Sequence, residues 1–335
     1  MHMKIVLSGL VLLCAHASAY ALDDPISLQR SDELGAVAAP QLEPDYAPLA
    51  ESDPQLVLAA AMPELSSQSV LVFDQTSGQA LLTKNATLQT PIASITKLMT
   101  AMLVIDAGQP LDEKITITSE DRDTLKGTGS RLAFGASYTR GQLLHLALIA
   151  SDNRAAHALA RTYPGGMGRF VNTMNRMAHA LGMKDTVYVE PTGLSSENRS
   201  TALDLAVLVD HAYQNYPEVR HISTTGNYTL GTQRVVLKKK NKKAQVLYRP
   251  VAFNNTNRFT RADDWHIGLS KTGFINEAGH CLVMQAQVAD RDVIIVLLDA
   301  QGKNNRAGDA TRIKEWLESS FPEYVAPAYK PASRT

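Results

Sequence analysis

Ser94 and Lys97, three residues apart, are the residues whose types and spacing first suggest catalysis in this chain. On a helix, residues with this spacing share one face, so the lysine amine can reach the serine hydroxyl. A neutral amine in that position can take the hydroxyl proton and activate the oxygen as a nucleophile. Both residue types are common, and a chain of this length contains about one such pair by chance. The pair therefore predicts a catalytic centre only if other parts of the chain complete it.

Two further polar stretches can complete that centre. Ser151-Asp152-Asn153 breaks an apolar helical pattern, so its short side chains can project into a cleft between two helices. Lys271-Thr272-Gly273 follows a β-rich run and stands at the end of a predicted strand. Ser196-Glu197-Asn198 repeats the serine-any-asparagine form, but it lies in a polar loop. We therefore favour Ser151 over Ser196 as the second serine of the site.

The elements that must position these stretches change along the chain from strands to helices and back to strands. Two β-rich runs at 69–74 and 79–84 flank a glycine-containing turn and predict a hairpin. A helix carrying Ser94 follows, with apolar residues at i, i+3, i+4 and i+7. Later helices are expected at 140–149, 154–161, 169–181, 201–213 and 309–319, and later strands at 233–237, 244–248, 267–272, 281–288 and 293–298. This order predicts an α+β fold in which both ends of the chain form one antiparallel sheet, flanked by helices, with a mostly helical lobe inserted between them.

The ends of the chain differ in composition from its middle. Residues 1–21 combine Lys4, a short apolar run and small residues before the first acids, which is typical of a cleaved signal peptide. Residues 22–63 form an acidic leader rich in proline and alanine, which we expect to be flexible, with a short docked helix as the alternative for 56–61. The folded domain is expected at 64–322, followed by a loose tail at 323–335. We therefore expect an exported protein.

Charge and residue counts argue against several kinds of partner and cofactor. The 33 basic and 33 acidic residues balance, which argues against a nucleic-acid partner. The nine histidines show no spacing of metal ligands, and serine and lysine chemistry needs no cofactor, so we expect neither a metal nor a cofactor. After signal cleavage Cys281 would be the one cysteine left, and its apolar neighbours predict a buried thiol. The lysine-rich segment 238–243 is expected to be the solvated tip of a hairpin.

In chain order the three stretches read Ser-x-x-Lys, Ser-x-Asn and Lys-Thr-Gly, and this set resembles the signature of the penicillin-binding proteins and serine β-lactamases. Within that superfamily the chain is most similar to the low-molecular-mass D-alanyl-D-alanine endopeptidases of the penicillin-binding protein 7 type. The sequence that carries this likeness lies at 91–102, 153–156, 163–166 and 190–195, and the likeness extends over residues 66–320. It implies a β-lactamase/DD-transpeptidase-like fold.

The resemblance implies the catalytic roles. Ser94 would attack a D-alanyl carbonyl and become an acyl-enzyme, Lys97 would be the base that activates it, and Ser151 would relay the proton to the leaving amine. The backbone N–H groups of Ser94 and Phe274 would form the oxyanion hole. Lys97 must be neutral to act as a base, and burial together with the nearby charge of Lys271 would lower its pKa.

The same resemblance implies the substrate contacts. Asn153 would hydrogen-bond the substrate backbone, while Lys271 and Thr272 would bind a substrate carboxylate. Gly273 would let the substrate strand lie close to the sheet. Peptidoglycan peptides are therefore the expected partners, with β-lactams as covalent inhibitors, and the sequence identifies no protein partner. Membrane association is expected to be weak or absent, since the last residues lack a cationic apolar stripe.

The implied function is that of a periplasmic serine DD-peptidase that hydrolyses D-alanyl cross-links of peptidoglycan through an acyl-serine intermediate. No residue pattern separates this DD-endopeptidase from a DD-carboxypeptidase that removes a terminal D-alanine, so that alternative stays open. A catalytically silent murein-binding protein is a third interpretation, disfavoured because all the site side chains are present. Neither Glu190 nor Glu197 has an asparagine four residues later, as the water-activating glutamate of class A β-lactamases has. We therefore expect bound β-lactams to be cleared slowly.

Overall fold

The structure is a computed structural model that describes residues 62–237, 245–302 and 304–321. The predicted signal peptide, nearly all of the leader with the alternative helix at 56–61, the lysine-rich tip at 238–243 and the tail lie outside these residues. No helix within the described ranges is long and apolar enough to cross a membrane.

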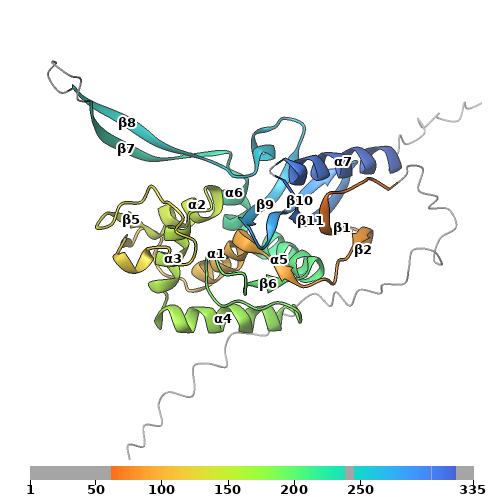
Figure 1. Cartoon of the computed structure of the whole chain (residues 1–335), viewed down its shortest axis with the longest axis horizontal. Coiled ribbons are helices and arrows are strands. Elements are labelled where there is room, and N and C mark those ends of the chain that lie inside the picture. The colour runs from red at the N-terminus through yellow and green to blue at the C-terminus, as the bar shows by residue number, and fades with distance from the viewer. Residues whose placement is uncertain (1–61, 238–244, 303, 322–335) are drawn as a thin grey trace, which may run out of the picture. The chain divides into compact units, whose positions relative to one another are not determined.

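Five antiparallel strands from the two ends of the described chain form the central sheet (Figure 1). The strands are β1 (Ser67–Asp74), β2 (Gln79–Lys84), β9 (His266–Ile275), β10 (Gly279–Val288) and β11 (Arg291–Ala300), in the order β2-β1-β11-β10-β9. Pairing of β1 with β11, in which Val72 lies opposite Ile295, joins the two ends. The edge strand β9 carries Lys271-Thr272-Gly273. The prediction of one antiparallel sheet made from both ends of the chain is therefore confirmed.

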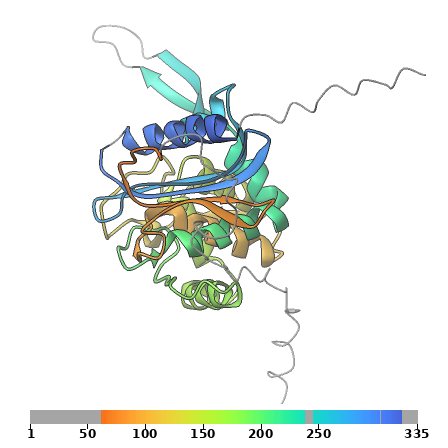
Figure 2. The ribbon, with the colours of Figure 1, turned by 90° about the vertical axis from the view of Figure 1, so that its right-hand side faces the viewer.

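Alternate residues of these strands pack into two separate cores, because side chains along a strand point to opposite faces. Val72 belongs to the core covered by α7 (Asn305–Ser320), together with Trp316 of that helix. Its neighbour Leu71 belongs to the larger core shared with the helical lobe. Figure 2 shows α7 on one side of the sheet and the lobe on the other. The sheet is thus packed on both faces, and its edge strand is a fixed wall for a site.

The helical lobe lies between β2 and β9 in the chain. It consists of α1 (Lys97–Asp106), α2 (Arg140–Ile149), α3 (Asn153–Arg161), α4 (Gly166–Ala180), α5 (Ala202–Asn215) and α6 (Pro217–Thr224). Helix α1 contacts the other five, while α5 packs on β1, β10 and β11, and α6 packs on β9. Helix α6 was not expected, because only Val219, Ile222 and Ser223 are buried in a short polar segment that shows no clear period.

Short elements complete the fold. Strand β3 (Thr90–Pro91) pairs with β6 (Arg199–Ser200), and β4 (Lys114–Thr116) pairs with β5 (Ser137–Thr139). Three 3₁₀ helices occur in the described chain, η1 (Ala93–Thr96), η2 (Ser119–Asp121) and η3 (Arg258–Arg261). The predicted late hairpin is a separate two-stranded sheet of β7 (Asn227–Leu237) and β8 (Gln245–Asn254), which projects away from the central sheet (Figure 1).

Candidate active site

The predicted nucleophile lies on a tight 3₁₀ turn, and the α-helix expected to carry it begins three residues later, at Lys97. Ala93, just before Ser94, has φ +46°, a left-handed conformation that costs a non-glycine residue roughly 1–3 kcal/mol and is frequent at functional sites. In a 3₁₀ helix, residues i and i+3 eclipse each other. Lys97 Nζ accordingly lies 2.7 Å from Ser94 Oγ. The sequence spacing therefore brings the pair together by a different helix type from the one predicted.

Lys97 is fully buried, and its amine has two further partners. Its Nζ donates to Asn153 Oδ1 at 2.7 Å and to the carbonyl oxygen of Thr192 at 2.5 Å. Burial lowers the pKa of Lys97 to about 8, although the charges of Glu190, Asp152 and Asp123 raise it. With this pKa, part of the amine is neutral near neutral pH, and the neutral form is the one that a general base needs.

Lys271 is the second buried amine of the site. Its Nζ donates to Ser151 Oγ at 2.9 Å and to the carbonyl oxygen of Thr272 at 2.8 Å. Burial, and then the charge of Lys97, lower the pKa of Lys271 well below its usual range. The sequence predicted that the charge of Lys271 lowers the pKa of Lys97; in the structure the charge of Lys97 lowers the pKa of Lys271. Burial lowers the pKa of both amines.

Ser151 and Asn153 reach the site from the break between α2 and α3. Ser151 has φ +55°, and Asp152 caps α3 by accepting a hydrogen bond from Ala155 N at 2.9 Å. The turn directs Ser151 toward Lys271 and Asn153 toward Lys97. The structure therefore brings the three predicted stretches together.

Gly273 allows close contact between the edge strand and the turn that carries Ser94. A Cβ at this position would lie 2.9 Å from Ile92 O, 3.0 Å from Ala93 Cβ and 3.1 Å from Ser94 N. Any side chain would push the turn away from β9. Gly273 is therefore required by the packing of the chain itself. This packing brings the amide of Ser94 beside the strand that continues into Phe274. A contact between Gly273 and a substrate strand stays a prediction.

Asn153 is oriented by a loop that the sequence did not single out. Thr128 Oγ1 donates to Asp123 Oδ2 at 2.6 Å and accepts from Asn153 Nδ2 at 2.8 Å. Because its own hydrogen is directed to the carboxylate, this hydroxyl is an acceptor toward Asn153. The amide nitrogen of Asn153 must then face Thr128, which leaves Oδ1 facing Lys97. Asp123 and Thr128 are common loop residues without a periodic pattern, so no sequence signal marked them.

A second loop holds the carbonyl of Thr192 beneath Lys97. The carboxylate of Glu190 accepts from Thr192 N at 2.7 Å, Thr192 Oγ1 at 2.5 Å and Gly193 N at 2.6 Å. Gly193 has φ +81°, and a Cβ on it would lie 1.9 Å from Ala93 O. This loop therefore packs directly against the nucleophile turn, and the carboxylate of Glu190 is bonded to the loop.

The rival stretch at Ser196-Glu197-Asn198 has a structural place in the same loop. Asn198 is fully buried, and its Nδ2 donates to Glu190 O at 2.8 Å and to Thr96 Oγ1 at 3.1 Å. It braces the loop, whereas Ser151 contacts Lys271. The choice of Ser151 over Ser196 agrees with this geometry.

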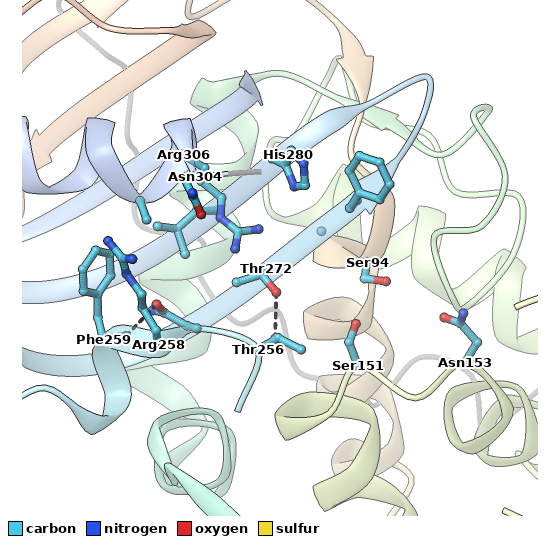
Figure 3. Close-up of a pocket in the computed structure, with 15 residues that line it drawn as sticks. Ser94, Ser151, Asn153, Thr256, Arg258, Phe259, Thr272, His280, Asn304 and Arg306 are labelled. Atoms are coloured by element: carbon cyan, nitrogen blue, oxygen red, sulfur yellow. Dashed lines mark hydrogen bonds between the residues drawn. The ribbon is translucent and has the colours of Figure 1, made fainter. Parts of the chain in front are cut away.

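A cavity of about 450 Å³ opens beside Ser94 and extends past the edge strand. Figure 3 shows its labelled residues running from Asn153 through Ser94 and Thr272 toward Arg306 and Arg258. Thr272 Oγ1 donates to Thr256 Oγ1 at 2.7 Å. At the rim, the ring of Phe274 is 52% exposed and stacks on His280 with centroids 4.3 Å apart.

The cationic end of this cavity was also missed in the sequence. Arg306 reaches it from the first turn of α7, where its Nη1 donates to Cys281 O at 3.1 Å, and burial lowers its pKa. Arg258 comes from η3. Neither arginine belongs to one of the three motifs, and only the folded chain places them together beside Thr272. Cys281 itself is buried, as predicted, and burial raises the pKa of its thiol to about 11.

The part of the chain that the structure describes contains no group of three or more histidine, cysteine, aspartate or glutamate side chains arranged to hold a metal ion. The site is built from hydroxyl, amine, amide and guanidinium groups. Such a set suits nucleophilic acyl transfer on an anionic substrate.

Comparison with known proteins identifies the family of the chain. A family model described as D-alanyl-D-alanine carboxypeptidase matches residues 56–302. The D-alanyl-D-alanine endopeptidase of Pseudomonas aeruginosa is 47% identical over 276 residues, covering 80% of this chain and 82% of the relative. The enzyme of the same name from Escherichia coli is 40% identical over 276 residues, covering 82% and 84%. The crystal structure of penicillin-binding protein D2 from Listeria monocytogenes in the ampicillin-bound form is 27% identical, with a TM-score of 0.63 and coverage of 78% of this chain and 100% of that one. The predicted resemblance and fold class are confirmed, and the chain belongs to the D-alanyl-D-alanine carboxypeptidase family, among the low-molecular-mass penicillin-binding proteins of the type 7 group.

Proposed function

We propose that this chain is a serine DD-peptidase that hydrolyses D-alanyl cross-links in peptidoglycan through an acyl-enzyme on Ser94. The observation that carries the proposal is the 2.7 Å contact between Ser94 Oγ and the buried amine of Lys97. The names of the Pseudomonas and Escherichia relatives support the endopeptidase activity.

The hydrogen bonds of Lys97 explain how it would act as the base. A neutral amine has two N–H groups and one lone pair. The carbonyl of Thr192 and Oδ1 of Asn153 can only accept hydrogen bonds, so they take the two N–H groups. The lone pair is then left for the hydroxyl proton of Ser94. The arrangement selects the direction of proton transfer that makes Ser94 a nucleophile.

Acylation would then proceed by attack of Ser94 Oγ on the D-alanyl carbonyl carbon, with the hydroxyl proton passing to Lys97. The backbone N–H groups of Ser94 and Phe274 would stabilise the oxyanion, and such donors are often worth about 3 kcal/mol of barrier each. Collapse breaks the peptide bond, and the proton that Lys97 took from Ser94 passes to the leaving amine with Ser151, which lies 2.9 Å from Lys271, as the relay; Lys97 is then neutral again. Water then attacks the ester carbonyl and gives one proton to Lys97, which returns it to Ser94 Oγ as the acid leaves.

The substrate carboxylate next to the leaving amine would bind at Thr272, with Lys271 behind it and Arg306 beside it in the same cavity. Asn153 would bind the backbone on the other side of Ser94. β-Lactams would acylate Ser94 in the same way, and slow clearance follows because the carboxylate of Glu190 is bonded to its own loop. We place the enzyme in the periplasm on the strength of the signal-like residues 1–21.

The carboxypeptidase alternative is favoured by the description of the family model, and it differs only in the leaving group. Mature protein incubated with cross-linked muropeptide dimers and, separately, with monomeric pentapeptide would separate the two activities when products are resolved by mass. We expect cleavage of dimers; absence of dimer cleavage refutes the endopeptidase assignment. Fluorescent penicillin should label the wild type and not Ser94→Ala, and a label that survives this substitution would remove Ser94 as the nucleophile. The silent alternative predicts no turnover of either peptide.

A further inference from the structure

The part of the cavity beyond Thr272 is strongly cationic. Its lining includes Arg258 and Arg306, and none of the described residues that line the whole cavity is acidic. The first turn of α7 adds partial positive charge, because Asn304 and Arg306 come from its N-terminal end. This end of the cavity therefore suits an anion.

The two guanidinium groups are free for a ligand to different degrees. Arg306 uses one nitrogen on Cys281 O, and Arg258 stacks over the ring of Phe259 at 5.3 Å. Within the described residues neither forms an ion pair with a carboxylate. By contrast, Arg261 of the same 3₁₀ helix is bonded to the carbonyls of Asn255 and Gly226. Arg258 is thus available for a ligand, while Arg261 braces the loop.

The two arginines also act on each other electrostatically. The charge of Arg258 contributes to the lowered pKa of Arg306, after burial as the larger cause. The repulsion between two cations in a cavity is reduced when a ligand brings negative charge between them. The carboxylate beside the scissile bond supplies one such charge near Thr272 and Arg306. Arg258 is then left to bind another.

A terminal D-alanine has no second carboxylate to offer. In a cross-linked dimer, the amine released by cleavage belongs to a diamino acid, whose aliphatic arm continues into a second peptide with further carboxylates. The cavity fits such an extension, because Phe259, Leu282 and Ala307 line it with apolar surface beside the two arginines. We propose that Arg258 forms a second anion subsite that binds a carboxylate of this acceptor peptide and favours cross-linked dimers over peptides ending in D-alanyl-D-alanine. The inference rests on the proposed peptidase function.

The test compares Arg258→Gln with the wild type on two substrates, cross-linked dimer and monomeric pentapeptide. A charge-assisted hydrogen bond at an accessible position justifies about a tenfold loss of kcat/KM on the dimer, with less than about a twofold change on pentapeptide. Arg258→Lys keeps the charge and should recover part of the loss. Arg176→Gln, an exposed arginine on α4 outside the cavity, is the matched control.

A second arm removes the charge from the substrate instead. Dimers that keep the carboxylate beside the scissile bond but carry amides in place of the other acceptor carboxylates should be poorer substrates for the wild type and should not distinguish it from Arg258→Gln. Melting temperatures and penicillin labelling confirm that each variant is folded. An equal loss on dimer and pentapeptide, or no loss on dimer, refutes the subsite while the peptidase stands. A wild type that does not cleave dimers refutes the endopeptidase function and the subsite together.

Discussion

Replacing Thr128 by valine should slow acylation of Ser94 while leaving the fold intact. The hydroxyl of Thr128 joins Asp123 to Asn153 through contacts of 2.6 and 2.8 Å, and valine has the same shape without it. One neutral hydrogen bond is worth about 0.5–1.5 kcal/mol. Because Asn153 loses the contact that keeps its Oδ1 toward Lys97, most of that energy should appear in the barrier. We expect acylation to slow by roughly threefold to tenfold, at about 1.4 kcal/mol per tenfold.

The assay is the second-order rate of labelling by fluorescent penicillin at constant pH. Thr128→Ser is the matched control, since it keeps the hydroxyl and loses only a methyl group. It should label at nearly the wild-type rate. The reasoning is refuted if the valine variant labels as fast as the serine variant, because the orientation of Asn153 would then not depend on this hydroxyl.

Three further outcomes follow from the same site. The proposed base Lys97 would act in its neutral form, and its pKa is about 8, so the labelling rate should rise with pH through that value and then level; a flat profile from neutral to alkaline pH would contradict its role as base. The charge of Glu190 raises the pKa of Lys97, so Glu190→Gln should move the rise to lower pH, and a move to higher pH would refute this coupling. Gly193→Ala puts a side chain at φ +81° and against Ala93 O, so it should lower the free energy of unfolding by at least about 1 kcal/mol and Tm by a few degrees, and it should abolish labelling. A wild-type Tm and labelling rate would show that the loop moves to accommodate the methyl group.

The sequence predicted those parts of the fold whose signals are local. Thr139 stands directly before the predicted helix at 140–149 and is of a residue type typical of helix caps, and its hydroxyl accepts from Gln142 N at 3.1 Å. The strands of the sheet were found because their apolar runs and turns are contiguous in the chain. Helix α6 was missed because its buried side chains are too few to show a period.

The site was predictable where its residues form short motifs and unpredictable where they act through tertiary contacts. Ser94, Ser151 and Lys271 stand in recognisable stretches, and the structure gathers all three. Thr128 and Arg306 are ordinary residues in their local sequence. Their importance comes from a partner far along the chain, which no local pattern encodes.

The pairing of β1 with β11 has a consequence for how this enzyme folds. Residue 72 lies beside residue 295, and the turn that carries Ser94 is made long before the strand that carries Lys271. Contacts between such distant parts of a chain form late and slowly in folding. A partly synthesised chain contains the proposed nucleophile Ser94 and its proposed base Lys97 but lacks the strand that carries Lys271. The site is therefore complete only after β11 has paired with β1, so hydrolysis requires that both ends of the described chain have folded together.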